Sequence, residues 1–409
     1  MIKNVIFDLG GVMIDFDFAR FMEGFGIKGR KNDRMMDVLF EHGVWRSIDK
    51  GTLKFAEACR AAIEIAPDLE PEFRLIFEHV NESFPLMPYA QAFLLAVKEA
   101  GYRVYILSNY GEEGFNYVKE RYELFKHVDG MVISYQIHGL KPHDEMYQAI
   151  LKKYSLDPEE CLFIDDKPEN IEGARSNGIE GIVAGTTEDV MESFMKITGK
   201  EFLDIRNEDG SLTGRIKERT LVHQDGDIHG TTHLWIVRRA GERDQREENE
   251  NNTARETCET GRIEVLLQKR SSNKDSHPGC YDTSSAGHIP AGCDYRGSAV
   301  RELKEELGIT AGPSDLIEIT DRAGVFVHHH AHKEENFGGR VFDNFEVCKA
   351  YLYTKPVDIK DITVQESEVE SVRWFDIDEV IERSEAEEPG FCILADEIKY
   401  VKERALQAL

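Results

Sequence analysis

The chain has 409 residues and a formal net charge of −27 at pH 7. An acidic surface of this kind repels nucleic-acid backbones and anionic membranes, so we expect neither as a partner. Hydrophobic residues make up 41% of the chain, which is enough to build folded cores and excludes wholesale disorder. At about 100–200 residues per domain, the length predicts two or three domains.

The seven cysteines are scattered along the chain and include no C-x-x-C pair. This pattern predicts neither a disulfide framework nor a zinc knuckle. Met1 leads almost directly into an apolar strand pattern, without the basic and apolar regions of a signal peptide, and no apolar run approaches about 18 residues. We therefore expect a cytoplasmic protein without a membrane span.

The first half, residues 1–200, alternates short apolar runs with amphipathic helical patterns. Alternation of this kind predicts an α/β fold in which helices wrap a parallel sheet. The first two predicted strands are separated by far more helical-looking residues than a crossover of about a dozen residues needs. We interpret residues 18–88 as an inserted helical cap. The predicted strands lie at residues 5–8, 102–110, 130–135, 161–166 and 181–185.

The second half, residues 201–409, does not alternate strands and helices in this way. It has several strand patterns around one strongly periodic helix at residues 297–307. This mixture predicts an α+β domain. Residues 240–262 contain almost nothing apolar and lie between two predicted strands, so we interpret them as an enlarged, mobile hairpin loop. The predicted strands lie at residues 232–239, 262–270, 346–354 and 369–377.

Four strands of the first half carry polar residues at or just after their C-terminal ends, where open α/β sheets place their ligands. A carboxylate nucleophile, a hydroxyl donor, a cation and a carboxylate pair together suit a phosphoryl group and Mg²⁺, which prefers oxygen ligands. A single strand-terminal Asp is more often a turn residue, but the ordered set favours a site. The set comprises Asp8, Ser108, Asn109, Lys141 (after SYQIHG, interpreted as the end of a strand), Asp165 and Asp166.

Residues 1–200 resemble hydrolases of the haloacid dehalogenase (HAD) superfamily in these motifs and in the cap. FDLGGV, LSN, GLKPHDEMYQAIL and FIDDKPENIEGARSNGI are especially similar to its sugar-1-phosphate phosphatases. The resemblance implies a Rossmann-like sheet, with Asp8 as the nucleophile that forms an aspartyl-phosphate. It also implies that Ser108 and Lys141 bind the phosphoryl oxygens, with Asn109 and Gly11 as further substrate-binding positions. The implied Mg²⁺ ligands are Asp8, Asp165, Asp166 and the backbone carbonyl of Gly10.

One position departs from the HAD pattern. The family's usual general acid and base is an Asp, and Gly10 stands in its place. Loss of such a group typically costs about 10²–10⁴ in rate, but it removes neither the nucleophile nor the metal ligands. We expect slow or leaving-group-selective phosphatase activity. The alternative is that the domain is a binding or scaffolding remnant.

Three glutamates of the periodic helix, Glu302, Glu305 and Glu306, share one helix face. Carboxylates at this spacing repel one another, and a divalent cation relieves the repulsion. The alternative is an acidic, solvated face, which is common in so acidic a chain. A glycine-rich loop before the helix and Gly308 at its end favour a cation site.

Residues 287–309 resemble the Nudix box, G-x5-E-x7-R-E-U-x-E-E-x-G-U. The resemblance implies a Nudix hydrolase fold over residues 201–409, with Glu302, Glu305 and Glu306 as Mg²⁺ or Mn²⁺ ligands or as the base. One position departs, because the first Glu of the pattern is Cys293. In the family that Glu pairs with the Arg, so its loss affects rigidity or rate more than metal binding. The matching positions are Gly287, Arg301, Glu302, Leu303, Glu305, Glu306, Gly308 and Ile309.

The second half also resembles isopentenyl-diphosphate isomerase, a relative within the Nudix fold. The cysteine that this isomerase uses is replaced by Ala286, and one of its glutamates is replaced by Asn344. Without the thiol, the proton shift lacks half of its acid–base pair, so we favour a hydrolase. We expect Arg301 and His288 to contact substrate. The positions that match the isomerase's metal ligands are His223, His229, His288 and Glu346.

A histidine-rich run, VHHHAHKE, begins at Val327. Adjacent histidines in a loop are more often solvated than bound to metal, and we interpret these as residues at the mouth of a pocket. A ligand role is the less favoured alternative. The run contains His328, His329, His330 and His332.

The two resemblances together predict a bifunctional, metal-dependent hydrolase of small phosphorylated molecules. The Nudix half would cleave a diphosphate to a monophosphate, and the HAD-like half would hydrolyse a phosphomonoester. The expected cofactor is Mg²⁺, with Mn²⁺ possible. One alternative makes the first half a non-catalytic phosphate sensor that regulates the Nudix half, and a less favoured one is an isomerase. The patterns do not identify the substrates or the oligomeric state.

Overall fold

The computed structural model describes the chain except for residues 241–261, 275, 320–324 and 333–341. The chain forms two compact units, Met1–Phe202 with Gly214–Glu218, and Leu203–Thr213 with Arg219–Leu409. Among the described residues, no helix has both the length and the apolar character that crossing a bilayer requires. The loop that we predicted to be mobile lies almost wholly outside the described residues.

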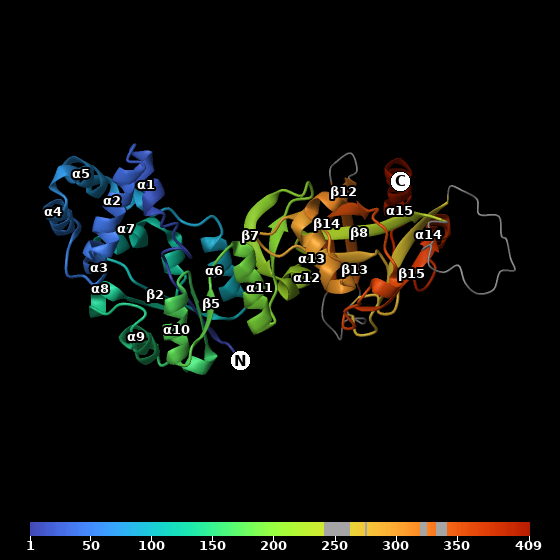
Figure 1. Cartoon of the computed structure of the whole chain (residues 1–409). Helices are drawn as coiled ribbons and strands as arrows, with labels where there is room; N and C mark the ends of the chain where they lie inside the picture. The colour runs from blue at the N-terminus through green and yellow to red at the C-terminus, as the bar shows by residue number, and fades with distance from the viewer. Residues whose placement is uncertain (241–261, 275, 320–324, 333–341) are drawn as a thin grey trace. The chain divides into compact units, whose positions relative to one another are not determined.

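The sheet of the first unit has five parallel strands in the order β3-β2-β1-β4-β5 (Figure 1). The central strand β1 pairs with β2 on one side and with β4 on the other, so Val5 lies between Val104 and Leu162. This order brings the carboxyl ends of β1, β2 and β4 to one edge of the sheet. The strands are β1 (Asn4–Phe7), β2 (Arg103–Ser108), β3 (Gly130–Ile133), β4 (Cys161–Asp165) and β5 (Glu180–Val183).

Helices cover both faces of this sheet because neighbouring residues of a strand point to opposite sides. Phe7 packs edge-on against Phe93 of α6, which in turn contacts Phe194 of α11. Its neighbour Ile6 belongs to the core formed with α9 and α10. The helices are α6 (Ala90–Glu99), α7 (Glu112–Arg121), η4 (Glu123–Lys126), α8 (Ser134–Ile137), α9 (Asp144–Tyr154), η5 (Pro158–Glu160), α10 (Pro168–Ser176) and α11 (Thr187–Thr198).

One predicted strand is shorter than expected. The pattern SYQIHG forms the short helix α8, so Lys141 follows a helix and a turn instead of a strand. The backbone turns at Ser134 because its hydroxyl donates to the carbonyl of Asp49 at 2.5 Å and accepts from the backbone N–H of Tyr110 at 2.8 Å. These two bonds tie the cap to the sheet edge.

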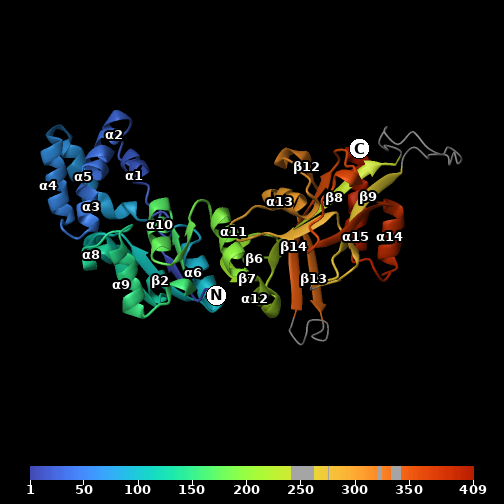
Figure 2. The same ribbon diagram turned by 60° about the horizontal axis from the view of Figure 1, so that its bottom comes forward.

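The inserted segment between β1 and β2 forms the predicted helical cap, which Figures 1 and 2 show as one group of helices separate from those that flank the sheet. Aromatic side chains fill its interior, with the ring of Phe16 5.4 Å from Trp45 and 5.9 Å from Phe84 between centroids. The elements are α1 (Phe18–Gly24), α2 (Arg30–Met36), η1 (Asp37–Glu41), α3 (Val44–Asp49), α4 (Phe55–Ile65), η2 (Pro67–Leu69), α5 (Glu70–His79) and η3 (Val80–Ser83).

The second sheet is mixed, and ten strands belong to it within the described part of the chain. The long strands β8 and β14 pair in parallel at its centre, and β9 and β11 pair antiparallel with β8. The strands are β6 (Phe202–Arg206), β7 (Leu212–Glu218), β8 (His229–Arg239), β9 (Ile263–Arg270), β10 (Tyr281–Asp282), β11 (Ser285–His288), β12 (Leu316–Ile319), β13 (Phe326–His332), β14 (Phe342–Tyr353) and β15 (Val369–Asp376).

Two layers of helices enclose this sheet (Figure 2). α13 buries Leu303 and Leu307 against Leu234 and its neighbours on one face. α14 and α15 pack on the other face, around Trp235 and other large apolar side chains. The helices are α12 (Arg219–Asp225), α13 (Tyr295–Leu307), η6 (Pro313–Asp315), η8 (Ile359–Asp361), α14 (Ile377–Glu385) and α15 (Ala395–Ala408).

Candidate active sites

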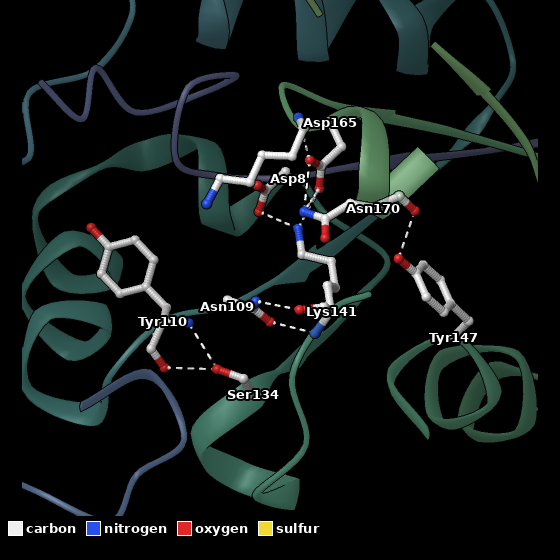
Figure 3. Close-up of polar contacts among 9 residues, drawn as sticks. Asp8, Asn109, Tyr110, Ser134, Lys141, Tyr147, Asp165 and Asn170 are labelled. Atoms are coloured by element: carbon white, nitrogen blue, oxygen red, sulfur yellow. Dashed lines mark hydrogen bonds and ion pairs between the residues drawn. The ribbon is translucent and has the colours of Figure 1, made fainter. Parts of the chain in front are cut away.

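A buried lysine joins two carboxylates at the carboxyl edge of the first sheet (Figure 3). The Nζ atom of Lys141 lies 2.8 Å from Asp8 Oδ1 and 2.5 Å from Asp165 Oδ2. All three side chains are almost fully buried. A buried cation with two anionic partners is fixed in position, and its charge stays where a phosphoryl group would need it.

Two asparagines hold this arrangement in place. The side-chain amide of Asn109 accepts from the backbone N–H of Lys141 at 2.8 Å and donates to its carbonyl at 3.1 Å. Asn170 Nδ2 donates to both oxygens of Asp165 at 2.8 and 3.0 Å. Asn109, which we predicted to bind substrate, therefore positions Lys141, while Asn170 orients Asp165.

Burial and neighbouring charges shift the pKa values of the ionisable groups in this cluster. Burial raises the pKa of Asp8 to about 7, although Lys141 opposes this effect. Burial lowers the pKa of Lys141, but Asp8 and Asp165 outweigh it, so the pKa of the lysine lies above its usual value. The lysine is therefore a permanent cation at neutral pH. Burial and the neighbouring Asp165 also raise the pKa of Asp166.

The carboxylates of this cluster fit a divalent cation. Oxygen atoms of Asp8, Asp165 and Asp166 lie within 4.8 Å of one another. Asp166 Oδ1 is buried without a hydrogen-bond partner, as expected of a ligand to a cation. The buried Ser108 hydroxyl lies beside Asp8 and lowers the pKa of that carboxyl. Gly11 allows the Asp166 carboxyl to lie close to the backbone of the loop after β1, because a Cβ atom at position 11 (φ +74°) would lie 2.6 Å from that carboxyl. Hard oxygen donors of this kind suit Mg²⁺.

Asp8, Gly11, Lys141 and Asp166 line one cavity of about 450 Å³ between the sheet edge and the cap. Its floor is polar and includes Asp8, Lys141 and Asp166, whereas the wall contributed by the cap is largely aromatic. The cap also adds two charged side chains from α3, Arg46 and Asp49. Burial raises the pKa of Asp49 to about 7, Lys167 lowers it, and the charge of Asp8 raises it further.

A second acidic cluster lies on α13, where Glu302 and Glu306 are one helical turn apart. Burial and then the charge of Glu306 raise the pKa of Glu302 to about 8. Burial also raises the pKa of Glu306 to about 7. Arg301 donates to Glu302 Oε1 at 2.8 Å, and the backbone N–H of Ala286 donates to Glu306 Oε2 at 3.1 Å. Two buried carboxylates with raised pKa values fit a divalent cation.

Glycine makes room for this cluster. A Cβ atom at Gly287 would overlap the carboxyl group of Glu302, so the strand must carry glycine here for the glutamate to reach the site. Glu305, which we predicted to act beside them, is about half exposed and lies 4.0 Å from Arg301 Nε. The structure therefore brings Glu302 and Glu306 together and leaves Glu305 nearer to solvent.

Three histidines form a third cluster, as their match to metal-ligand positions had suggested. Nitrogen atoms of His223, His229 and His288 lie within 4.8 Å of one another. The Nε2 atoms of His223 and His229 are buried without hydrogen-bond partners. Burial lowers the pKa of all three imidazoles, so they stay neutral and able to bind a cation. Glu346 raises the pKa of His229 and accepts from Asn344 Nδ2 at 2.7 Å.

Comparison with known proteins identifies both halves. A haloacid dehalogenase-like hydrolase family matches residues 2–178, and the NUDIX domain matches residues 253–395. An uncharacterized Nudix hydrolase of Clostridium acetobutylicum is 38% identical over 181 residues, which cover 44% of this chain and 72% of that protein. The chain is a fusion of a HAD-like hydrolase and a Nudix hydrolase.

Two further relatives belong to the HAD side. The D-ribitol-5-phosphate phosphatase of Bacteroides thetaiotaomicron is 26% identical over 191 residues, which cover 44% of this chain and 90% of that protein. A HAD family enzyme of the same species, solved with magnesium and inorganic phosphate, is 24% identical, with a TM-score of 0.40 over 47% of this chain and 100% of that chain. The predicted families and fold classes of both halves are confirmed.

The glycine at position 10, where the HAD motif usually has an aspartate, is not required by the space around it. A Cβ atom at Gly10 would have Phe16 Cβ as its nearest neighbour at 3.9 Å, which is ordinary van der Waals contact. The backbone at Gly10 also lacks the positive φ that favours glycine. The backbone at position 10 could therefore carry a side chain, and the glycine there is not required by its φ or by the space for a Cβ atom.

Cys293 stands where the Nudix box usually has a Glu, and one donor atom of Arg301 has no hydrogen-bond partner. Arg301 Nε is buried without a hydrogen bond, as expected if Cys293 cannot accept from it as the family's Glu does. Arg301 Nη2 still reaches Glu302 and, at 3.5 Å, the carbonyl of His288. The Nudix domain thus keeps the arrangement of Glu302 and loses one contact behind it.

Sequence patterns missed the cap residues of the HAD-like site. Arg46 and Asp49 lie at i and i+3 on α3, so one helix face presents both to the cavity. The only available signal was this spacing within WRSID, which surface helices share. In the histidine run, His328 is buried and His329 is exposed and lies 2.7 Å from Asp343 Oδ1, while the side chains of His330 and His332 lie outside the described residues.

Proposed function

We propose that the chain is a bifunctional, metal-dependent hydrolase in which the Nudix half cleaves a small-molecule diphosphate and the HAD-like half removes phosphate from a monoester. The observation that carries this proposal is that each half holds neighbouring acidic side chains whose pKa values are raised by burial and by a nearby carboxylate, Asp8 beside Asp165 in the first half and Glu302 beside Glu306 in the second. The product of diphosphate cleavage is a monophosphate, which is the substrate class of the second activity.

In the HAD-like half, Asp8 is the group that attacks phosphorus and forms an aspartyl-phosphate. Lys141 and Ser108 bind the phosphoryl oxygens, since one is a fixed cation and the other a buried hydroxyl beside the nucleophile. Asp8, Asp166 and the carbonyl of Gly10, with Asp165 close by, would hold Mg²⁺, which would supply positive charge to stabilise the phosphoryl group. Water then hydrolyses the aspartyl-phosphate and regenerates Asp8.

Asp49 takes the acid–base role that Gly10 cannot fill. Asp49 lines the same cavity as the nucleophile, from the cap helix α3, and the charge of Asp8 raises its pKa. A carboxyl group with a pKa of about 7 holds a proton for a leaving alkoxide below that pH and accepts one from water above it. The backbone carbonyl of Asp49, held by Ser134, fixes the helix that carries it.

Replacement of Asp49 by asparagine should slow alcohol release from alkyl phosphates by about 10²-fold, because the leaving alkoxide loses its proton donor. Single-turnover release from p-nitrophenyl phosphate should change little, since a nitrophenolate leaves without a proton. Gly10→Asp has room for its side chain and should restore alkyl phosphate cleavage in the Asp49→Asn background. Equal slowing of both substrates, without rescue, would contradict the acid–base role.

The aromatic cap wall favours an alcohol with an apolar face. Phe16, Phe40, Trp45 and Phe55 line the cavity, with Ile48 beside them. Burial of about 60–100 Å² of apolar surface contributes roughly 2 kcal/mol. We expect kcat/KM for phosphates of aromatic or branched apolar alcohols to exceed that for sugar phosphates by about tenfold or more. Trp45→Ala should reduce this preference, and a preference for sugar phosphates in the parent would contradict it.

In the Nudix half, water attacks one phosphorus of the diphosphate. Glu302 and Glu306 would hold Mg²⁺ or Mn²⁺, which screens the diphosphate charge when bound. The neutral imidazoles of His223, His229 and His288, with Glu346, offer a further cation position on the same domain. Ala286 provides no thiol near these histidines, which favours hydrolysis over the isomerase chemistry.

Product masses test the whole proposal. The full chain should convert a diphosphate with Mg²⁺ first to the monophosphate and then to the free alcohol. Asp8→Asn should stop the sequence at the monophosphate, and Glu306→Gln should leave the diphosphate intact but still allow added monophosphate to be hydrolysed. If the parent leaves every monophosphate intact while the diphosphate is cleaved, the HAD-like half is a sensor; if isopentenyl diphosphate is isomerised, the Nudix assignment is wrong.

A further inference from the structure

A second set of metal-binding side chains lies in the Nudix domain, on the face of the sheet that α15 covers. Ligand atoms of His233, His328 and Cys348 lie within 4.8 Å of one another. Glu397 of α15 completes the set: His233 Nδ1 lies 2.9 Å from Glu397 Oε1, and His328 Nε2 lies 3.3 Å from Glu397 Oε2. We call these four residues the His-His-Cys-Glu cluster.

The four side chains converge from four separate elements. His233 belongs to β8, His328 to β13, Cys348 to β14 and Glu397 to α15. Cys348 is fully buried, and Glu397 and His328 are less than one-tenth exposed. Ligand atoms of the thiol and the two imidazoles lie within 4.8 Å of one another, and the Glu397 carboxylate contacts both imidazoles. Together they offer four donors, which is the number that a structural zinc site uses.

Neighbouring groups orient the cluster as they would the ligands of a metal. Trp235 Nε1 donates to Glu397 Oε1 at 2.9 Å, and Glu397 Oε2 lies 3.0 Å from His233 Nδ1 and 3.3 Å from His328 Nε2. The rings of His233 and His328 are stacked 5.6 Å apart, with an angle of 10° between their planes. His328 Nε2 is buried and lacks a well-formed hydrogen bond. Partners that fix ligand orientation are typical of metal centres.

The cluster is separate from the acidic Nudix site, although it lies beside the three-histidine cluster. Glu302 and Glu306 belong to α13, which packs on the opposite face of the sheet from α15. On β14, Cys348 comes two residues after Glu346, so both side chains point to the same face. On β8, His233 and His229 share that face in the same way. The cluster thus lies next along the strands from the histidines that match isomerase ligands.

We propose that the His-His-Cys-Glu cluster is a structural zinc site that ties the C-terminal helix α15 to strands β8, β13 and β14. Thiolate and imidazole donors favour Zn²⁺ over Mg²⁺, which prefers oxygen ligands. Four protein donors leave no open position for a substrate, as in structural sites. The metal would replace the present contacts between Glu397 and the two histidines and bind the thiolate of Cys348.

Cobalt substitution tests this site in the full chain. Metal-free protein titrated with Co²⁺ should develop a thiolate-to-cobalt charge-transfer band, because Cys348 supplies a sulfur ligand that the carboxylate and three-histidine clusters lack. Zinc-loaded protein should show a sulfur neighbour at about 2.3 Å by X-ray absorption spectroscopy. Cys348→Ser should abolish both signals and lower the zinc content by about one ion per chain.

Cys392→Ser is the matched control, because Cys392 lies in the same domain, and its Sγ donates to the carbonyl of Tyr281 at 3.3 Å, away from the cluster. That variant should keep the charge-transfer band and the sulfur neighbour. His328→Ala should weaken zinc binding and lower the melting temperature of zinc-loaded protein more than that of metal-free protein. If the parent shows neither sulfur signal, the four residues form a metal-free network of ion pairs and the zinc site is wrong.

Discussion

Asp8→Asn should abolish phosphomonoester hydrolysis, with a loss of about 10⁴-fold or more in kcat/KM. The asparagine keeps the size of the side chain but cannot form the aspartyl-phosphate. The readout is Mg²⁺-dependent release of inorganic phosphate from p-nitrophenyl phosphate. Diphosphate cleavage by the Nudix half, measured on the same preparation, should be unchanged.

This variant should remain folded, because Lys141 keeps Asp165 as a partner at 2.5 Å when the charge of Asp8 is removed. Burial already raises the pKa of Asp8 to about 7, which shows that the charged carboxylate is unfavourable there. Its replacement by a neutral amide therefore removes a desolvation penalty from the folded state. Asp37→Asn, an exposed change in the cap, serves as the control. Retention of phosphatase activity by Asp8→Asn would exclude the aspartyl-phosphate route.

The sequence offered candidate residues for the HAD-like site because these residues follow strand ends. An apolar run that stops at a polar residue is visible without a structure, and parallel strands bring those ends to one edge. Asp8, Ser108 and the Asp165–Asp166 pair were all found in this way. Lys141 lies beside Asp8 and Asp165 at this edge, although the preceding strand was predicted too long and α8 stands in its place.

Side chains that reach a site from elements distant in the sequence have no local sequence pattern that predicts their position. Asp49 reaches the cavity because α3 docks against α8 through Ser134, a contact between residues 85 positions apart. The His-His-Cys-Glu cluster depends on the register of β8, β13 and β14 and on the placement of α15. Its histidines and cysteine have no common spacing, because the pairing of distant strands, and not the local pattern, brings them together. The histidine-rich run VHHHAHKE, which is conspicuous in the sequence, contributes one residue, His328, to the cluster.

Glu306→Gln should reduce diphosphate cleavage by about 10³-fold, because it removes a cation ligand and halves the paired negative charge at the site. Phosphatase activity of the HAD-like half should be retained, which separates this effect from misfolding. Glu370→Gln is the control, since Glu370 forms an exposed ion pair with Lys269 on the same domain. The measurement is product formation from a diphosphate at saturating Mg²⁺. Unchanged cleavage in Glu306→Gln would remove this glutamate from the metal site.

Stability without metal gives an independent test of the same residue. Burial raises the pKa of Glu306 from 4.5 to about 7, so folding favours its protonated form. The stability that this preference provides is complete below about pH 4.5 and is lost as pH rises through about 7, with an upper bound of roughly 3 kcal/mol. The amide introduced by Glu306→Gln has no charge to desolvate, so above pH 7 the metal-free variant should melt at the same temperature as the parent or higher. Mg²⁺ should then raise the melting temperature of the Nudix domain more in the parent than in the variant, because only the parent keeps the paired carboxylates of that domain, whereas both proteins keep the carboxylates of the HAD-like half. A metal-free variant that is less stable than the parent at this pH would show that Glu306 stabilises the fold as a charged group, contrary to a site built to receive a cation.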